Sequence, residues 1–123
     1  MTTTKQDAPL VGVVGPCSSG KSTLVAGLQK YEIRIRHIAQ EHSYVKDMWR
    51  RFSNPDLLIF LHVSYPVAQE RRKQSWTLKE YETQIQRLRH AAEHADFHLD
   101  TDNKTPAEIL AEVVNFLKGT GLL

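Results

Sequence analysis

The residues with the clearest chemical potential run from Gly15 to Thr23 and read Gly-Pro-Cys-Ser-Ser-Gly-Lys-Ser-Thr. Their spacing satisfies G-x-x-x-x-G-K-[ST], the pattern of a loop whose backbone N–H groups bind phosphate oxygens. Gly15 and Gly20 let the chain turn tightly and approach a phosphate without an intervening side chain. The pattern therefore predicts that this segment holds the phosphates of a nucleoside triphosphate.

Within the loop, each polar residue has an expected part. Lys21 is a mobile cation that reaches the β- and γ-phosphates, and the Ser22 hydroxyl ligates a Mg²⁺ ion that bridges them. The N-terminus of the following helix adds partial positive charge. The expected ligand-binding residues are Gly15, Ser18, Ser19, Gly20, Lys21, Ser22 and Thr23.

Cys17 lies in the same loop and has two interpretations. As a thiol at a helix N-terminus it is a candidate for oxidation, because that position favours the thiolate. As a small loop residue it contributes only its backbone amide, and this is the interpretation we favour. It is the single cysteine of the chain, so it forms no disulfide within it.

Hydrophobic patterning predicts the elements that position the loop. Uninterrupted apolar runs at 10–14 and 57–63 are typical of strands buried on both faces. Alternation at 33–36 indicates a strand with one wet face at a sheet edge, and a short strand is expected at 97–99. Helices are expected at 21–30, from Ser43 to the Asn54-Pro55 stop, from Pro66, from Thr77 after a break at Ser75-Trp76, and from Thr105 to Gly119.

Two of these helices have apolar stripes that predict which face is buried. The first stripe follows Ser43, and the second follows the Thr77 capping box. Their members are Val45, Met48, Trp49 and Phe52 in the first helix, and Leu78, Tyr81, Ile85, Leu88 and Ala92 in the second.

Strands that alternate with helices predict an α/β fold with a parallel sheet and right-handed crossovers. We expect a three-layer α/β/α P-loop fold with about four strands in the order 2-1-3-4, and ligand at the carboxyl ends of the strands. A chain of 123 residues can bury one core. We therefore predict a flexible tail at 1–8 and a single domain that binds nucleoside triphosphate at 9–123.

Composition narrows the classes of partner. The formal net charge is only +2, which is too balanced to favour nucleic acid by bulk electrostatics. No apolar run approaches the ~18 residues that a membrane helix needs. The polar start of the chain does not resemble a secretory signal, so we expect a cytoplasmic protein without membrane contact.

Beyond the loop, two segments resemble the small P-loop kinases that phosphorylate nucleosides, nucleotides and other metabolites. The run from Pro55 through Arg72 is similar to the kinase strand and proline-led helix that lead to an arginine-bearing lid. The run from Ala95 to Asp102, continued by Thr105–Glu108, is similar to their last strand and helix. In those kinases the loop between this strand and helix lies against the adenine ring.

The resemblance implies an ATP-dependent phosphotransferase that uses Mg²⁺ and acts on a small-molecule acceptor, which the sequence does not identify. Arg71 and Arg72 become candidates to neutralise the transferring phosphoryl group. The alternative interpretation is that both arginines lie on a solvated face of the helix. Thr101, Asp102 and Asn103 either border the base or form the turn before the last helix. Asn103-Lys104 does not continue into a guanine signature, which favours adenine.

The chain also departs from the resemblance. These kinases place an acidic residue after the strand beside the loop strand, and Glu41 is the candidate here, to hold the magnesium's water shell or to take a proton from an acceptor. Asp47 and Asp56 are alternative candidates for this role. Glu41 is otherwise interpreted as an ordinary acidic residue of a loop, without a part in catalysis. The segment from Lys21 to Glu41 is too short for the family's acceptor-binding insertion. A nucleotide-binding regulatory module and a slow NTPase are therefore alternatives.

Two further patterns have structural and functional interpretations. His90-Ala-Ala-Glu-His94 spells H-x-x-E-H, an inverted zinc-peptidase motif that His98 continues at a spacing of four. We interpret these residues as surface histidines on the long helix, because a further ligand well downstream is needed. Trp49, flanked by two arginines, either stacks a base or anchors the core, and we favour the core.

Overall fold

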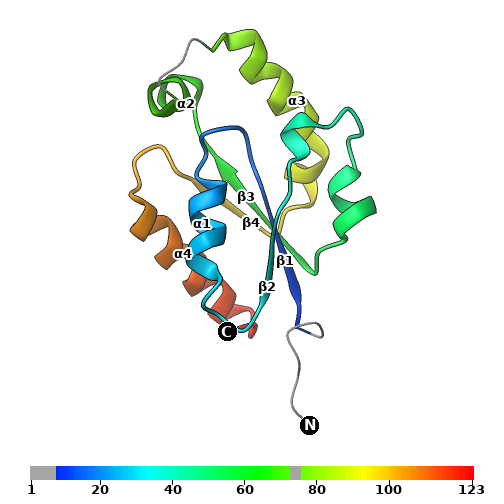
Figure 1. Cartoon of the computed structure of the whole chain (residues 1–123), viewed down its shortest axis with the longest axis vertical. Helices are drawn as coiled ribbons and strands as arrows, with labels where there is room; N and C mark the ends of the chain where they lie inside the picture. The colour runs from blue at the N-terminus through cyan, green and yellow to red at the C-terminus, as the bar shows by residue number, and fades with distance from the viewer. Residues whose placement is uncertain (1–7, 73–75) are drawn as a thin grey trace.

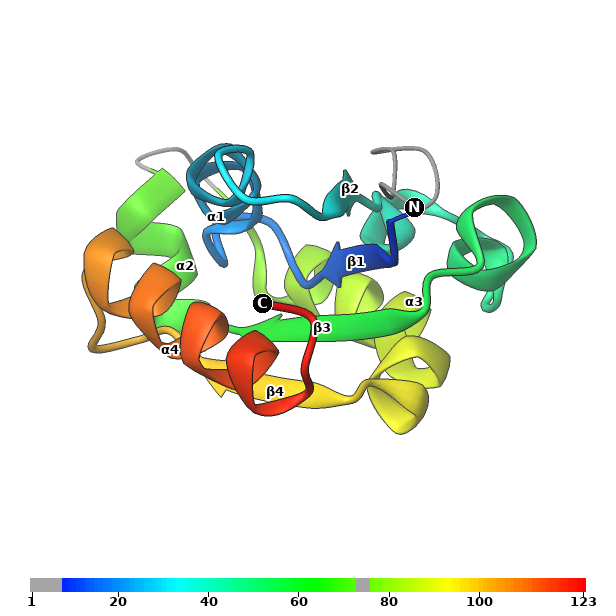
Figure 2. The ribbon, with the colours of Figure 1, turned by 90° about the horizontal axis from the view of Figure 1, so that it is seen from below.

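The computed structural model describes residues 8–72 and 76–123. Its centre is a four-stranded sheet, all parallel, in the spatial order β2-β1-β3-β4, seen from top to bottom in Figure 2. The α/β fold and the strand order 2-1-3-4 are as the sequence predicts. The strands are β1 Leu10–Val14, β2 Arg34–His37, β3 Leu57–His62 and β4 Phe97–Asp100.

Helices cover both faces of the sheet (Figures 1 and 2). They are α1 Lys21–Leu28, α2 Tyr65–Arg72, α3 Leu78–His94 and α4 Pro106–Gly119, with a short 3₁₀ helix η2 Gln40–His42 and a π-helix η3 Trp49–Ser53. On one face, α1 and α4 pack on alternate residues of β1 and β3, including Val11, Val13 and Ile59. On the other, α3 and Trp49 pack on Val14, Leu58 and Phe60.

β1 is buried throughout and β3 at its four central residues, as uninterrupted apolar runs predict, because helices cover both faces of these strands. The expected edge strand is β2, which pairs only with β1 among the described strands. Parallel strands bring their carboxyl ends to the same edge of the sheet, and the loops after β1, β3 and β4 meet there.

The predicted helix from Ser43 is wrong. η2 ends just before Ser43, the chain then turns, and the π-helical turn η3 follows. Local hydrogen bonds compete with the helix, because the Ser43 hydroxyl accepts from the Val45 N–H and the buried Gln40 side chain accepts from the Trp49 N–H. Trp49 is buried as favoured, but Val45 and Phe52 are 45% and 78% exposed, so the apolar stripe does not exist.

The long helix α3 begins as predicted, since the Thr77 side chain accepts from the Glu80 N–H. Its buried face is turned from the expected one and consists of Gln84, Leu88 and Ala91, while Leu78 is exposed. Of the predicted break, Ser75 lies outside the described residues, and Trp76 is buried between α2 and α3.

The last helix, α4, begins with the predicted capping box, in which Thr105 and Glu108 bond reciprocally. It ends at Gly119 as predicted, with Gly119 as its last helical residue. The left-handed residue is Gly121, with φ 85°, and the N–H groups of Gly121 and Leu122 bond back to Lys118 and Leu117. This is a Schellman ending.

Most of the expected N-terminal tail, residues 1–7, lies outside the described residues. Ala8 is buried, and its carbonyl accepts from the Arg34 side chain at 2.8 Å. Among the helices that the structure describes, none combines the length and apolarity needed to cross a membrane.

Candidate functional site

The loop predicted to bind phosphate connects the carboxyl end of β1 to the first turn of α1 (Figure 1). Gly15 passes so close to β3 that a Cβ atom there would lie 2.4 Å from the Leu61 carbonyl oxygen and 2.7 Å from Ser19 Oγ. Gly20, with φ 102°, takes the left-handed conformation that starts the helix. Both glycines of the pattern are thus required by the backbone path.

The first turn of α1 offers an anion the partial positive charge of a helix N-terminus. The structure describes every residue of this turn, and none is acidic. The side chains of Ser22 and Thr23 are exposed. The N–H groups at a helix N-terminus carry partial positive charge and lack partners within the helix. A phosphate can therefore bind at this turn without displacing a competing carboxylate of the helix.

Lys21 is folded back over its own loop. Its ammonium donates to the carbonyl oxygens of Gly15 and Pro16 at 2.7 and 3.0 Å and pairs with Glu41 Oε2 at 3.0 Å. The side chains of Lys21 and Glu41 are only 5% and 3% exposed. The structure thus brings together the loop lysine and the acid that the sequence nominated.

Glu41 is positioned by the residue before it. The buried Gln40 side chain donates to the carbonyls of Val45 and Arg87 and accepts from the Trp49 N–H, which fastens η2 between α3 and η3. Within the described residues, Glu41 Oε1 is buried without a hydrogen-bond partner. A buried carboxylate oxygen in this condition is costly, and a bound ligand or ion would satisfy it.

The two carboxylates that competed with Glu41 lie elsewhere. Asp56 accepts from the Leu10 N–H at 2.7 Å, at the amino end of β1 and so at the opposite edge of the sheet. Asp47 pairs with Arg51 at 2.9 Å, and this guanidinium is the main cause that lowers the pKa of Asp47. Of the three candidates, only Glu41 contacts the loop.

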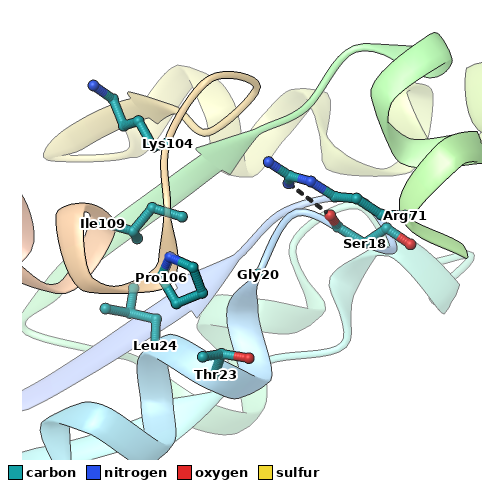
Figure 3. Close-up of a pocket in the computed structure, with 8 residues that line it drawn as sticks. All are labelled: Ser18, Gly20, Thr23, Leu24, Arg71, Lys104, Pro106 and Ile109. Atoms are coloured by element: carbon teal, nitrogen blue, oxygen red, sulfur yellow. Dashed lines mark hydrogen bonds between the residues drawn. The ribbon is translucent and has the colours of Figure 1, made fainter.

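Arg71, on the last turn of α2, reaches the loop from the other side. Its guanidinium donates to the Ser18 carbonyl at 3.0 Å (Figure 3) and also to the hydroxyl and the carbonyl oxygen of Thr101. The Thr101 hydroxyl lies within hydrogen-bond distance of the Ser19 and His62 carbonyls, at 3.0 and 2.9 Å. These bonds connect the loop to the carboxyl ends of β3 and β4.

A cavity of about 210 Å³ opens beside Arg71, between the start of α1 and the start of α4. Leu24, Pro106 and Ile109 line one side, with Lys104 beside them, and Arg71 lies across from them (Figure 3). A cleft for a whole drug-sized ligand usually has about 300–1,000 Å³, so this one suits part of a nucleotide. It is lined by Ser18, Gly20, Thr23, Leu24, Arg71, Lys104, Pro106 and Ile109.

Arg72, predicted as an equivalent of Arg71, faces a different space. Its guanidinium lies 5.1 Å from the centre of the Trp76 ring, which is a cation–π contact. Both residues line a groove of about 300 Å³ between α3 and η2. Its lining residues are His42, Arg72, Trp76, Glu80, Thr83, Gln84 and Arg87.

Asp102, expected either to border a base or to form the turn before the last helix, lies in that turn. Its carboxylate accepts from the Ser64 N–H at 2.8 Å and so joins the β4–α4 loop to the segment before α2. Lys104 and Pro106 from the same loop line the cavity. An ion pair with Glu112 at 2.9 Å raises the pKa of Lys104, which remains a cation at neutral pH.

Sequence reasoning missed Gln84. Its side chain accepts from the Cys17 N–H at 2.9 Å, and its amide lies 3.2 Å from Cys17 Sγ, so it holds the loop from α3. A signal was present, because Gln84 lies on the same helical face as Leu88 and Ala91. A polar residue on a buried face needs a partner.

The H-x-x-E-H histidines do not form a common site. His90 and His94 lie on α3, where His90 Nδ1 accepts from Trp49 Nε1 at 3.1 Å. His98 lies on β4 and contacts His62 at 2.8 Å. Among the described residues, the three side chains whose metal-binding atoms lie together are Cys17, Glu41 and His42.

The residues at the loop fit a magnesium ion. Mg²⁺ prefers oxygen ligands and keeps several waters, and the site offers the exposed Ser22 hydroxyl and Glu41 Oε1, which has no hydrogen-bond partner among the described residues. Comparison with protein-family models and with curated proteins finds no match. The site is therefore interpreted from its own geometry.

Proposed function

We propose that this chain binds a nucleoside triphosphate, favouring ATP, together with Mg²⁺, and acts as a small phosphotransferase similar to the P-loop kinases. One observation supports it above the others: the complete G-x-x-x-x-G-K-[ST] pattern lies between the carboxyl end of a central parallel strand and the N-terminus of a helix. A chance match to the pattern would have no physical reason to lie between a buried strand and a helix N-terminus.

Phosphate binding requires Lys21 to change partners. Its ammonium now bonds to the Gly15 and Pro16 carbonyls and to Glu41, so a triphosphate must offer stronger acceptors. Phosphate oxygens carry formal charge and bond to ammonium more strongly than neutral carbonyls do. When Lys21 turns to the phosphates, the Glu41 carboxylate becomes free for Mg²⁺ or its water shell.

Magnesium would supply charge neutralisation between the β- and γ-phosphates. In this chain Ser22 offers it a hydroxyl oxygen and Glu41 a carboxylate oxygen. Arg71 is placed to turn from the Ser18 carbonyl towards phosphate oxygens. The apolar wall of the 210 Å³ cavity, between Leu24 and Pro106, suits a base or ribose.

The acceptor would bind in the groove between α3 and η2. It adjoins the loop, because Gln84 and His42 contact Cys17 from there. Arg72 and Arg87 make it cationic, which suits an acceptor that carries a phosphate or carboxylate.

A second candidate is a nucleotide-binding regulatory module that works inside the cytoplasm without phosphoryl transfer. It is favoured by how Lys21 and Arg71 are held. Lys21 bonds to two carbonyls of its own loop and pairs with Glu41 of η2. Arg71 of α2 donates to the Ser18 carbonyl of the loop and to the Thr101 carbonyl after β4. Nucleotide binding would release these bonds together, and a partner could detect the change. Slow hydrolysis without an acceptor is a variant of this candidate.

Binding is tested by calorimetry with MgATP, MgGTP and ATP in EDTA. We expect MgATP to bind and EDTA to weaken binding. Ser22→Ala should lose the magnesium dependence without loss of stability, because the side chain is exposed. Ser53→Ala, near the opposite edge of the sheet, is the matched control. No heat with any triphosphate would refute the proposal.

Transfer is tested with γ-labelled ATP and panels of nucleosides, nucleotides, sugars and small acids. Label on an acceptor supports the phosphotransferase, and Arg72→Gln should then raise the acceptor KM more than the ATP KM. Label released only as phosphate supports the NTPase. Tight binding with neither outcome leaves the regulatory module.

A further inference from the structure

Beside the loop lysine, three potential metal ligands of different chemistry meet at one point. Cys17 Sγ lies 3.6 Å from His42 Nε2, and Glu41 Oε2 lies 3.8 Å from the same nitrogen. One ligand atom from each side chain falls within 4.8 Å of the other two. Cys17 comes from the loop after β1, whereas Glu41 and His42 come from η2, so the fold assembles the group.

These separations suit a small tetrahedral cation. Zinc binds sulfur at about 2.3 Å and nitrogen or oxygen at about 2.0–2.1 Å, which places tetrahedral ligands about 3.3–3.6 Å apart. The sulfur–nitrogen separation of 3.6 Å already meets this requirement, and the oxygen–nitrogen separation of 3.8 Å needs only a small adjustment. Mixed sulfur, nitrogen and oxygen ligands select zinc-like metals over magnesium or calcium.

An independent feature also indicates a missing ligand. In the described part of the chain, Glu41 Oε1 has no hydrogen-bond partner although the side chain is only 3% exposed. A carboxylate that is buried and half satisfied is expensive to keep, and a cation beside it removes that cost.

We propose that Cys17, Glu41 and His42 form a binding site for a zinc-type divalent cation. Binding forms a metal–sulfur bond, and the thiol proton is released to solvent. One thiolate and one carboxylate supply two negative charges, with His42 neutral, and Lys21 then shares the Glu41 charge with the ion. Three protein ligands leave a fourth position for water.

The surroundings of the three ligands support the site. The Gln84 amide lies 3.2 Å from Cys17 Sγ and its oxygen accepts from the Cys17 N–H, so Gln84 fixes the sulfur as an outer-shell partner does. Lys21 keeps its two carbonyl partners if Glu41 turns towards the ion. His42 is 59% exposed and lines the groove beside α3, which gives the ion a path of entry.

One consequence rests on the proposed function. A zinc-type ion and the Lys21–Mg²⁺–triphosphate arrangement both need the single carboxylate of Glu41. Zinc is therefore expected to weaken MgATP binding, and this effect should disappear in His42→Ala. The metal site itself does not require nucleotide, so either proposal can fail alone.

The test is titration of the reduced full-length chain with Co²⁺, followed by displacement with Zn²⁺. We expect a thiolate-to-cobalt charge-transfer band in the near ultraviolet and visible d–d bands of tetrahedral intensity, both lost when zinc displaces cobalt. Cys17→Ser should abolish the charge-transfer band. His42→Ala should weaken the affinity by about tenfold or more, the scale seen when metal sites lose a supporting group.

His94→Ala is the matched control, because His94 is an exposed histidine on α3 outside the group. It should bind cobalt as the parent does. Circular dichroism shows whether each variant remains folded. Absence of the charge-transfer band in the parent, or an unchanged affinity in His42→Ala, overturns the proposal.

Discussion

Lys21 and Glu41 form a buried ion pair at the phosphate-binding loop. Their charged atoms lie 3.0 Å apart, and both side chains are almost fully buried. A buried ion pair adds little net stability compared with apolar residues, but removal of one partner leaves an uncompensated charge. The same two residues are those proposed to change partners when nucleotide binds.

At this pair we predict a strong non-additive effect on stability. Lys21→Met should lower the free energy of unfolding by about 3 kcal/mol, because the buried Glu41 carboxylate loses its counter-charge. Adding Glu41→Gln should restore much of this loss, since the charge is then removed as well. Urea denaturation of the two single variants and the double variant measures the coupling. Additive losses would show that the pair is not coupled as the geometry requires.

The sequence led to Lys21 through a local pattern and to Glu41 through a family resemblance. It did not lead to Gln84 or His42, because their contacts with Cys17 span 67 and 25 residues of chain. Such contacts depend on how η2 and α3 dock on the sheet. The resemblance left Asp102 either at the base or in the turn before α4, and its partner, the Ser64 N–H, could not be predicted because it depends on the packing of α2.

Among the elements, the loop between β1 and α1 has the least freedom. Gly15→Ala would place a Cβ atom 2.4 Å from the Leu61 carbonyl oxygen, so the backbone of β3 or of the loop must move. We expect destabilisation by about 1–3 kcal/mol, as for other overpacked sites, together with loss of phosphate binding.

The matched control is Gly119→Ala, where nothing lies within 4 Å of the added methyl group and the backbone is helical. Alanine there should stabilise α4 by about 0.5 kcal/mol or more. Thermal unfolding of both variants checks the contrast. Equal effects would mean that the close approach to β3 is not rigid.

The N-terminus of α4 carries a second prediction. Thr105→Ala should destabilise the chain by about 1 kcal/mol, because the Thr105 hydroxyl accepts from the Glu108 N–H in the capping box. The Thr105 N–H donates to the Glu108 carboxylate, and this bond is the main cause that lowers the pKa of Glu108. NMR titration should therefore find Glu108 ionised below the pH at which a free glutamate protonates.

Strands and capped helices were predictable because their signals are local: uninterrupted apolar runs, a Thr-Pro-x-Glu start and helical spacing. The segment from Ser43 to Ser53 was not. Its apolar residues follow helical spacing, yet the Gln40 side chain bonds to the Trp49 N–H and the Val45 carbonyl across nine and five residues. A buried glutamine thus overrides the pattern, and the sequence gives no sign that Gln40 is buried.

For the molecule as a whole, the sheet order determines where chemistry can occur. With β1 between β2 and β3, the loop after β1 is flanked by η2 on one side and by Arg71 and Thr101 on the other. The carboxyl edge holds the loop, the cavity and the groove, whereas Asp56 and Asp96 bond to strand N–H groups at the amino edge. The amino edge is therefore held by side-chain bonds to the strands, and the carboxyl edge is where we propose that ligand binds.

The stability of the whole molecule should depend on pH near neutrality through two histidines. Burial is the main cause that lowers the pKa of both His62 and His90, with added repulsion from His98 for the first and from His94 and Arg50 for the second. Asp100 opposes the shift at His62, and Asp47 opposes it at His90, but the net direction is downward. In addition, protonation of His90 Nδ1 would remove the acceptor for Trp49 Nε1.

A histidine whose folded pKa lies below its unfolded value binds fewer protons in the native state. Stability is then complete above the unfolded pKa, about 6.5, and falls as the pH drops through that value towards the folded pKa. We therefore expect the midpoint of urea denaturation to be lower at pH 5.5 than at pH 7.5. In the double variant His62→Gln, His90→Gln this difference should shrink, because glutamine does not titrate. A midpoint that rises on acidification would contradict the arrangement of these histidines, whatever ligand the loop binds.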